Sequence, residues 1–559
     1  MRCDYTFLMS GGAKKATPLT AGPLLFSAFF LMAAFGPALS PVQAADPAKS
    51  PAKSPAKSSA TAAPRLDPYN TALSNFNKAT QARSAATNNN SRLAADAQIN
   101  ASIQEMKTVA ASPALQADKE KQATLHNLIG YLYLSQQEPE QAIPELQQTV
   151  ALNPGNLEAH NNLGNALRQT GRFDEAAAQY GYVLDYRTPG SSSPDPSRVK
   201  FNRATALGQA GKTDEALALF TQLTANGAGD AATYKNYGFF LQKAGRGPEA
   251  AAALHRSAVL NPKDGSAWLG AGELYERAGQ HDEAIESLNQ ALAPAVTPAL
   301  DVASQYDTHF TLGEAYAAKN NTTDAVTQFD TAATLQPNNA TPMYNKGVLQ
   351  EQAGLKTEAA ASYHDALARD GSNLQAQTAL GLLLADLGQN EEAATVLTQA
   401  SSRMPQDAQA APVYSRLGDV QAVQKNYYAA NNARREALAL NPADVQTRLV
   451  WADSLMAQKQ YFSALTQYTA AAQARPGDSA IQNQRGVAYQ KLKQYPKALA
   501  AFKKAAALDP KSAQVQNNIG VIYENLHQRP PAIAAYKRAL ALDPTLNVAR
   551  ANLKRFAQK

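Results

Sequence analysis

One alanine recurs at a fixed phase along most of this 559-residue chain. Eight of the eleven successive differences between these alanines equal 34 residues, and the other three are 40, 41 and 37. A 34-residue period is typical of a helix–turn–helix unit that buries its apolar face only by stacking on its neighbours. The period predicts a solenoid, whose function depends on surface rather than on one catalytic pocket. The alanines are Ala142, Ala176, Ala216, Ala250, Ala284, Ala325, Ala359, Ala393, Ala430, Ala464, Ala498 and Ala532.

Two further columns share this phase. The residue twelve positions before each alanine is small, and in ten of twelve cases it is glycine, as at Gly130 and Gly520. Glycine inside a helix costs about 1 kcal/mol relative to alanine, so its recurrence predicts a close approach of two helix backbones. Four residues after each alanine a large side chain, such as Leu146 or Tyr536, leaves the same helix face. Only Arg434 breaks this column.

Turn residues divide each unit into two helices. Gly171, Gly211 and Gly279 are predicted to end first helices. Asp174, Asp214 and Asp282 are predicted to open the second helices that follow. A proline then ends many second helices, at Pro154, Pro262, Pro442, Pro510 and Pro544.

The segments AWLGAGELYERAGQHDEAIESLNQAL and NNIGVIYENLHQRPPAIAAYKRALALDP carry the Trp, Leu, Gly, Tyr, Ala, Phe and Pro pattern of a known family almost completely. Here the chain resembles the tetratricopeptide repeat family, over twelve repeats at 123–544. The resemblance implies an all-α fold, a right-handed superhelical α-solenoid of tetratricopeptide helix hairpins with terminal capping helices. Residues 67–122 are predicted as a helical N-terminal cap or degenerate repeat. Residues 545–559 are predicted as a C-terminal capping helix, because Lys554 stands where glycine or alanine recurs.

The N-terminus is typical of an exported protein. Residues 1–44 are predicted as a signal peptide, with an apolar run from Leu24 to Phe35 and small residues before a cleavage point at Ala44. An uncleaved membrane anchor is the alternative. Residues 45–66 are a Pro/Ala/Lys/Ser-rich tract, which is predicted to be a disordered linker. We expect the protein in the periplasm or outside the cell, released or membrane-anchored.

The formal net charge of +6 does not predict a nucleic-acid partner. Of this charge, +5 lies in the first 65 residues, which leaves +1 for the rest of the chain. We therefore expect a nearly neutral body without the basic stripe that binds phosphates.

No catalytic residue, cofactor site or metal site is predicted. The adjacent carboxylates, such as Asp174 and Glu175, occupy starts of second helices, where negative charge meets the positive end of the helix dipole. The seven histidines are interpreted as scattered over different phases, without metal-ligand spacing. An enzyme with its chemistry in 67–122, or shared with a partner, is the alternative.

The resemblance implies that partners bind in a concave groove lined by the first helices. A column of asparagines could pair with an extended peptide, and acidic residues, Glu351 among them, could attract a cationic partner. Asparagines that only bond neighbouring helices, and carboxylates that only form a solvated lining, are the alternatives. The predicted partner-binding residues are Asn162, Phe201, Asn202, Lys235, Asn236, Phe239, Glu273, Glu276, Phe310, Glu314, Tyr344, Asn345, Asp419, Asp453 and Asn518.

The sequence thus predicts an exported, non-catalytic scaffold that binds protein or peptide segments in the groove of a tetratricopeptide superhelix. The alternative is a membrane-anchored accessory subunit of polysaccharide export or of pilus or secretion assembly. Charge reversal of Glu273, Glu276 and Glu314 is expected to weaken partner capture and to leave helicity intact.

Overall fold

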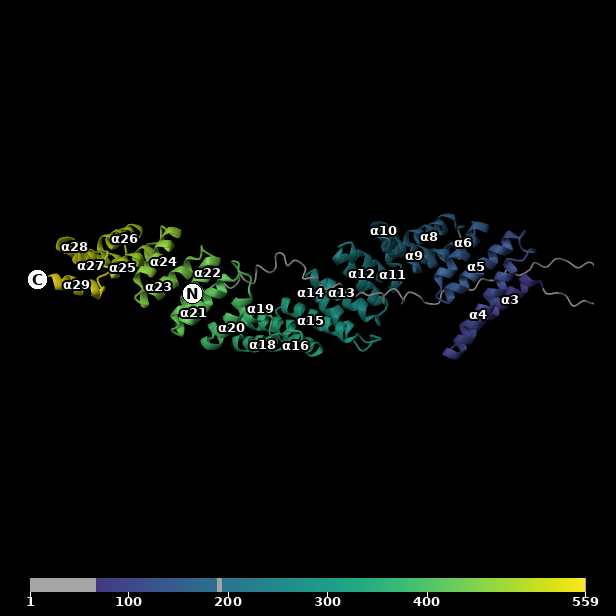
Figure 1. Ribbon diagram of the computed structural model, residues 1–559, viewed down its shortest axis with the longest axis horizontal. Helices are drawn as coiled ribbons and strands as arrows, with labels where there is room; N and C mark the ends of the chain where they lie inside the picture. The colour runs from purple at the N-terminus through teal and green to yellow at the C-terminus, as the bar shows by residue number, and fades with distance from the viewer. Residues whose placement is uncertain (1–66, 189–193, 558–559) are drawn as a thin grey trace, which may run out of the picture. The chain divides into compact units, whose positions relative to one another are not determined.

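A computed structural model describes residues 67–188 and 194–557 (Figure 1). The predicted signal peptide and linker lie outside the described residues. In the described ranges the ordered elements are α-helices and one short 3-10 turn, and no strand is present. The predicted all-α fold class is confirmed.

The chain divides into two compact units. Unit 1 comprises 1–280 and 289–299, and unit 2 comprises 281–288 and 300–559, so that the boundary falls within α14 (His281–Ala291). The other helices of unit 1 are α3 (Pro68–Ala85), α4 (Asn89–Ala110), α5 (Lys119–Ser135), α6 (Pro139–Leu152), α7 (Leu157–Gln169), α8 (Phe173–Tyr186), α9 (Pro196–Gln209), α10 (Thr213–Thr224), η1 (Ala225–Gly227), α11 (Ala231–Lys243), α12 (Gly247–Leu260) and α13 (Gly265–Arg277).

The other helices of unit 2 follow the same alternation. They are α15 (Val302–Ala318), α16 (Thr322–Leu335), α17 (Thr341–Gln352), α18 (Lys356–Arg369), α19 (Leu374–Asp386), α20 (Asn390–Arg403), α21 (Ala411–Val423), α22 (Tyr427–Leu440), α23 (Val445–Ala457), α24 (Tyr461–Ala474), α25 (Ser479–Lys491), α26 (Tyr495–Leu508), α27 (Ala513–Asn525), α28 (Arg529–Leu542) and α29 (Asn547–Ala557).

Within each unit every helix other than α14 packs against its neighbours along the chain, from α3 to α13 and from α15 to α29. Odd-numbered helices from α5 to α27 are the first helices of the repeats, and even-numbered helices from α6 to α28 are the second helices. Because contacts run mainly between sequence neighbours, the architecture is an α-solenoid.

The recurring alanines and glycines serve one packing arrangement. All twelve recurring alanines have no exposed surface. A Cβ atom on Gly164 would lie 2.7 Å from the Tyr180 ring, and one on Gly520 would lie 2.5 Å from the Tyr536 ring. The nearest neighbour of these glycines is thus the recurring large side chain of the second helix. At Gly238 a backbone carbonyl oxygen of α12 would also lie 3.2 Å from such a Cβ, so the predicted close approach of two backbones accompanies this contact there.

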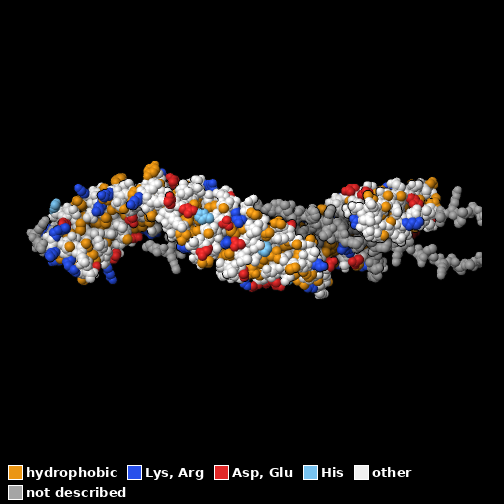
Figure 2. All heavy atoms as spheres, turned by 90° about the horizontal axis from the view of Figure 1, so that it is seen from below, with side chains coloured by type: hydrophobic (Ala, Val, Ile, Leu, Met, Phe, Trp, Pro, Cys, Tyr) orange, Lys and Arg blue, Asp and Glu red, His pale blue; other side chains and the backbone are white. Residues whose placement is uncertain are grey.

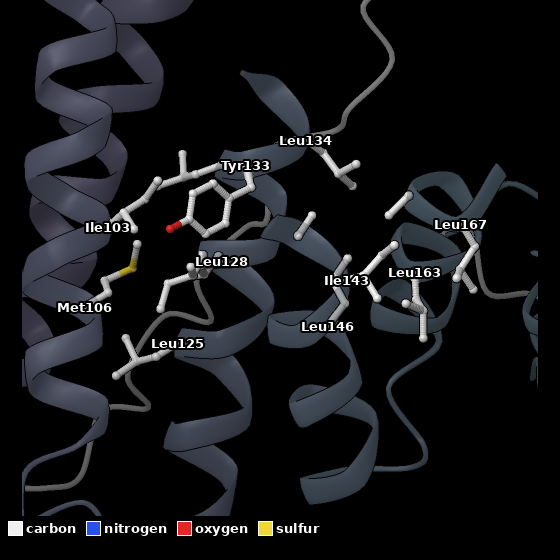
Figure 3. Close-up of a cluster of buried hydrophobic side chains, with 14 of the residues drawn as sticks. Ile103, Met106, Leu125, Leu128, Tyr133, Leu134, Ile143, Leu146, Leu163 and Leu167 are labelled. Atoms are coloured by element: carbon white, nitrogen blue, oxygen red, sulfur yellow. The ribbon is translucent and has the colours of Figure 1, made fainter. Parts of the chain in front are cut away.

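The core is continuous through the first hairpins of unit 1. Ile103 and Met106 on α4 lie beside side chains of α5, and Leu146 on α6 lies beside Leu163 on α7 (Figure 3). All four side chains are less than 4% exposed. Apolar burial of this kind stabilises by about 25 cal/mol per Å², so the hairpins depend on their neighbours for stability.

The turn prediction is half correct. Gly171, Gly211 and Gly279 have φ of 78°, 86° and 74°, the left-handed conformation that glycine adopts without strain. Asp174, however, does not open α8, because the helix begins at Phe173 and Asp174 lies in its first turn.

Side-chain capping is instead a feature of most first helices. Asn156, for example, accepts a 3.0 Å hydrogen bond from the backbone N–H of Ala159 at the start of α7. The predicted openings at Asp214 and Asp282 are wrong in the same way, since α10 begins at Thr213 and α14 at His281. The adjacent carboxylates do lie in first turns, as their electrostatic interpretation requires.

Helices outside the repeats pack at the two ends of the array. α3 and α4 form a hairpin in which the Asn75 amide donates a 2.8 Å hydrogen bond to Glu105, and α4 packs against α5. α5 begins at Lys119, before the predicted repeat start at 123. At the other end α29 packs against α28, and the Asn552 amide donates a 3.1 Å hydrogen bond to Asn517.

Candidate partner-binding face

The predicted groove residues all lie on first helices, and we call the surface of these helices the first-helix face. In unit 1 they lie on α7, α9, α11 and α13, and in unit 2 on α15, α17, α21, α23 and α27. Their exposure is uneven. Phe239, Glu314 and Asp453 are exposed, and the others are half-buried or buried.

Asn162, Phe201 and Asn202 offer little surface to a partner, since they are 8%, 7% and 9% exposed. The Asn202 amide donates a 3.3 Å hydrogen bond to Asn165 of the preceding repeat. Neighbouring repeats are joined through such amides, which agrees with the alternative that these asparagines bond adjacent helices.

Two other predicted asparagines also donate an amide hydrogen bond to a residue of the array. The Asn518 amide donates 3.0 Å to Asn483 of the preceding repeat. The Asn236 amide donates 2.9 Å to the carbonyl of Ala232 in its own helix. Asn345 on α17 is half-buried. The first-helix face therefore does not present a continuous column of asparagines whose amides are all available to a peptide.

Lys235 joins two first helices. Its ammonium donates to Asp264 at 2.6 Å and to the Ser266 hydroxyl at 2.9 Å, and Asp264 is the N-cap of α13. Burial lowers the pKa of Lys235, whereas the Asp264 charge opposes this effect. The side chains of both partners are 22% exposed, so this pair has a clear structural role in holding α11 to the start of α13.

Phe239 is the exposed edge of an aromatic cluster on α9, α10 and α11. Its ring centroid lies 5.2 Å from that of Phe240, which lies 5.7 Å from that of Phe220. Gly208 makes room for Phe240, since a Cβ there would lie 2.2 Å from the ring. The cluster holds Phe239, which is 45% exposed, as an apolar patch on the first-helix face.

Large side chains of the second helices reach the first-helix face from behind. The Tyr180 hydroxyl donates a 2.7 Å hydrogen bond to Asn165, and the Tyr363 hydroxyl donates a 2.9 Å bond to Glu351. The Tyr536 hydroxyl donates likewise to Glu524 at 2.9 Å.

Asp453, one of the predicted site residues, accepts from the Tyr468 hydroxyl in the same way. Burial raises the pKa of Tyr180 to about 12, and burial also raises the pKa of Tyr363 and Tyr468. These phenols therefore stay protonated and donate. The sequence signal for this contact is a tyrosine in the large-residue column with an acid or amide twelve or fifteen residues before it.

Arg434 replaces the aromatic or aliphatic residue in this column and is 2% exposed. Its guanidinium donates a 2.9 Å hydrogen bond to Asp419, whose side chain is 38% exposed. Asp419 thus compensates a buried cation. The Asp419 carboxylate therefore pairs with a buried cation and is also partly exposed on the first-helix face.

Aromatic and acidic side chains alternate on α15 and α17 of unit 2. The Phe310 ring stacks on Tyr306 with centroids 5.8 Å apart, and its centroid is also 5.8 Å from that of Phe329. The Tyr344 centroid lies 5.9 Å from that of the buried Tyr363. Both groove aromatics are half-buried and rest on buried rings.

The carboxylates of this segment differ in environment. Glu314 on α15 is exposed, and Glu351 on α17 is half-buried. Burial raises the pKa of Glu351, the Tyr363 hydrogen bond opposes this, and the Asp386 charge adds to it. In unit 1, Glu273 and Glu276 are half-buried on α13, and a Glu273 oxygen lies 3.7 Å from the Arg277 guanidinium.

The interpretation of the histidines as unrelated in phase is wrong for three of them. His126, His160 and His309 occupy the same position of the first helix, and Nδ1 of each contacts a Glu or Gln nineteen residues later at 2.6, 2.7 and 2.6 Å. The three histidines are equivalent because each lies sixteen residues before the recurring alanine of its repeat. They tie first helices to second helices of the same repeat and form no metal site.

Two further negative findings hold for residues 67–188 and 194–557. None of their helices combines the length and hydropathy that a bilayer span requires. No group of three or more His, Cys, Asp or Glu side chains is placed to hold a metal ion there.

Family models described as tetratricopeptide repeat match most of the array. One matches residues 127–192, 241–297 and 310–374, and others match 197–221, 374–399, 479–512 and 513–546, together more than half of the chain. The chain belongs to the tetratricopeptide repeat family. Such chains are generally non-catalytic, and this one is a protein–protein interaction scaffold.

No curated protein matches the chain. Solved structures of MamA proteins are similar to part of the chain. A MamA structure described as AMB-1 is 24% identical, covers 30% of this chain and 98% of that chain, and has a TM-score of 0.27. MamA from Desulfovibrio magneticus RS-1 is 21% identical, covers 32% and 98%, and has a TM-score of 0.28. These likenesses concern the helical repeat alone.

Proposed function

We propose that the first-helix face of unit 2 binds an extended protein segment that carries Lys or Arg beside apolar residues. The observation that supports this proposal is the alternation of Phe310 and Glu314 on α15 with Tyr344 and Glu351 on α17. The half-buried rings offer apolar area, and the carboxylates offer charge to a cation.

Preorganisation favours this segment over the rest of the face. The rings of Phe310 and Tyr344 rest on the buried rings of Phe329 and Tyr363, and Glu351 is held by the Tyr363 hydroxyl. A surface whose side chains are already ordered loses less conformational entropy when a partner binds.

Binding should weaken in acid. The cationic partner requires Glu351 to be ionised, and the pKa of Glu351 is already raised above its ordinary value of 4.5, chiefly by burial. Affinity is therefore expected to fall as the pH drops through this raised pKa.

Selection of displayed random peptides with the full chain tests the proposal. The selected peptides should be enriched in Lys and Arg, and Glu314→Gln with Glu351→Gln should remove the enrichment. Glu358→Gln with Asp365→Asn on α18 is the matched control, because it removes the same charge from a second helix. Selected peptides without excess Lys or Arg would refute the proposal.

We also propose that the protein is exported to the periplasm or beyond the cell. The arrangement of residues 1–44 supports export, with an apolar run from Leu24 to Phe35 before small residues at Val42 and Ala44. The alternative, an anchored accessory subunit of polysaccharide export or of pilus or secretion assembly, is favoured by the long segment before that run. Amino-terminal sequencing of the mature protein decides between them, since an anchored form retains the apolar run.

A further inference from the structure

Charge in unit 2 is divided between two segments of opposite sign, although the chain after residue 65 is nearly neutral as a whole. Residues 479–559 contain 14 Lys and Arg against 3 Asp and Glu, a net charge of +11. Residues 300–410 contain 5 Lys and Arg against 13 Asp and Glu, a net charge of −8. The small net charge of the chain after residue 65 hides this division.

The basic part is exposed. Figure 2 shows blue side chains gathered over the end of the molecule that carries α25 to α29 in Figure 1. Consecutive second helices repeat one pair of cations there, Lys503 and Lys504 on α26 and Lys537 and Arg538 on α28. All four are exposed, and none forms an ion pair with a carboxylate of the described chain. We call these four residues the basic column.

The acidic part has a corresponding column. Asp324 on α16, Glu358 on α18 and Glu392 on α20 occupy the same position of three consecutive second helices, and all are exposed. Asp324 accepts from the Asn321 amide at 2.6 Å, and Glu392 lies 3.1 Å from the His364 ring. We call these three residues the acidic column.

We propose that the basic column of one molecule binds the acidic column of a second copy. Members of both columns are separated by one 34-residue repeat, so the spacing between charges is set by the same stacking of hairpins on both copies. The contact uses second helices and is independent of partner binding on the first-helix face.

The rest of the basic surface agrees with a protein partner. The exposed large apolar side chains of 479–557, within the described residues, are Leu508, Leu542 and Val548. The aromatic ring beside these cations, that of Tyr523 at 5.6 Å from the Lys503 ammonium, is half-buried, whereas the usual platforms for bases are exposed rings.

The contact is heterologous, because the two columns are different surfaces. Each copy that binds through its basic column leaves its acidic column available, so association can continue beyond a dimer. Mass should therefore rise with protein concentration. It should fall with salt, because the Debye length shortens from about 10 Å at 0.1 M to about 3 Å at 1 M.

Light scattering coupled to size exclusion tests the proposal on the full chain. At about 50 mM salt the mass should exceed that of one chain, and at about 1 M salt it should equal one chain. Reversal of the basic column by Lys503→Glu, Lys504→Glu, Lys537→Glu and Arg538→Glu should give the mass of one chain in low salt. The matched control reverses four exposed cations of unit 1 and should associate like the wild type; these are Lys78, Lys119, Arg256 and Lys263.

A charge swap identifies the occupant. The variant Asp324→Lys, Glu358→Lys and Glu392→Lys should not associate with itself in low salt, but its mixture with the basic-column reversal should associate. Circular dichroism checks that both variants keep wild-type helicity. A wild-type mass of one chain at every concentration in low salt would overturn the proposal.

Failure of the mixture to associate would also overturn it. Binding of anionic vesicles or duplex DNA that disappears on reversal of the basic column, with the wild type still of single-chain mass, would assign the surface to another partner and refute self-association.

Discussion

Asp419 lies on the first-helix face but forms an ion pair with Arg434, which is buried. The Arg434 side chain is 3% exposed and its charge is compensated by Asp419, which is itself partly exposed. Removal of the Asp419 carboxylate leaves the buried Arg434 cation unpaired, whereas removal of the Arg434 cation leaves only a partly exposed carboxylate.

Asp419→Ala is therefore expected to lower the free energy of unfolding by roughly 2–3 kcal/mol. Arg434→Leu restores the aliphatic residue found at this position elsewhere and should change stability by less than about 1 kcal/mol or increase it. Urea denaturation measures both. A larger loss in Arg434→Leu than in Asp419→Ala would contradict this account of the pair.

Glu145 gives unit 1 a defined response to acid. Burial opposes its ionisation, but hydrogen bonds from His126 and Lys107 outweigh burial and hold the pKa of Glu145 below its ordinary value of 4.5. The folded state therefore binds fewer protons at Glu145 than the unfolded chain does. Its stabilisation is fully present above pH 4.5 and is lost as the pH falls through the lowered pKa.

The comparison of Glu145→Gln with the wild type measures this effect. The variant should melt at a lower temperature at neutral pH, and the difference should shrink toward zero as the pH falls below about 4. A difference that stays constant with pH would show that the charge of Glu145 does not stabilise the fold.

At the scale of single residues the sequence predicted which side chains are buried but not which hydrogen bonds they form. The burial of the twelve alanines follows from their recurrence at one position of the repeat. The hydrogen bonds of Asn202, Asn518 and Lys235 do not, because a repeat pattern shows which residues share a helix face but not whether an amide or ammonium turns toward a neighbour or toward solvent.

Most hairpins of the array match a first-helix glycine to the large side chain of the second helix, since ten of the twelve repeats carry that glycine. In the α11–α12 hairpin a Cβ on Gly238 would lie 2.8 Å from Cγ of Leu254 and 3.2 Å from the Ala250 carbonyl oxygen. Gly247, at the start of α12, has no neighbour within 4 Å of such a Cβ. The same hairpin thus contains a tight glycine and an open one.

Gly238→Ala is expected to destabilise the fold by about 1–3 kcal/mol, since overpacking outweighs the better helix propensity of alanine. Gly247→Ala should be neutral or slightly stabilising. Thermal unfolding of both variants checks the prediction. Equal effects of the two substitutions would mean that the recurring glycine reflects helix propensity or turn conformation rather than packing against Leu254.

The hairpins themselves were predictable because glycine, alanine and a large residue recur in phase. The starts of the second helices were not, because Asp174 and Asp214 resemble N-caps but lie in the first turn, where they interact with the helix dipole. A preference for acids near a helix start does not distinguish these two positions.

In the whole molecule, the helices are stabilised by contacts with helices adjacent along the chain rather than by one central core. α29 contacts α28 and α27 at the C-terminal end of unit 2, and the Arg555 guanidinium donates to Glu524. Deletion of 547–559 should therefore speed amide hydrogen exchange in α27 and α28 and leave α5 to α8 unchanged. Uniformly faster exchange throughout the chain would contradict a solenoid with local cooperativity.

The division of charge can be counted from the sequence, but the net charge of all residues after 65 does not show it. Only placement of the cations on α26 and α28, and of the acids on α16 to α20, shows that the charges form columns. Partner chemistry is less predictable, because the fold sets where side chains are presented and leaves their identity to the variable positions.

The central claim is that partners bind the first-helix face between α15 and α17. A Lys-bearing peptide from the display selection can be joined to the full chain with a zero-length reagent that links amines to carboxylates, and the products mapped by mass spectrometry. The account predicts links to Glu314 and Glu351. Links to Glu358 and Asp365 on α18, with none on α15 or α17, would contradict it.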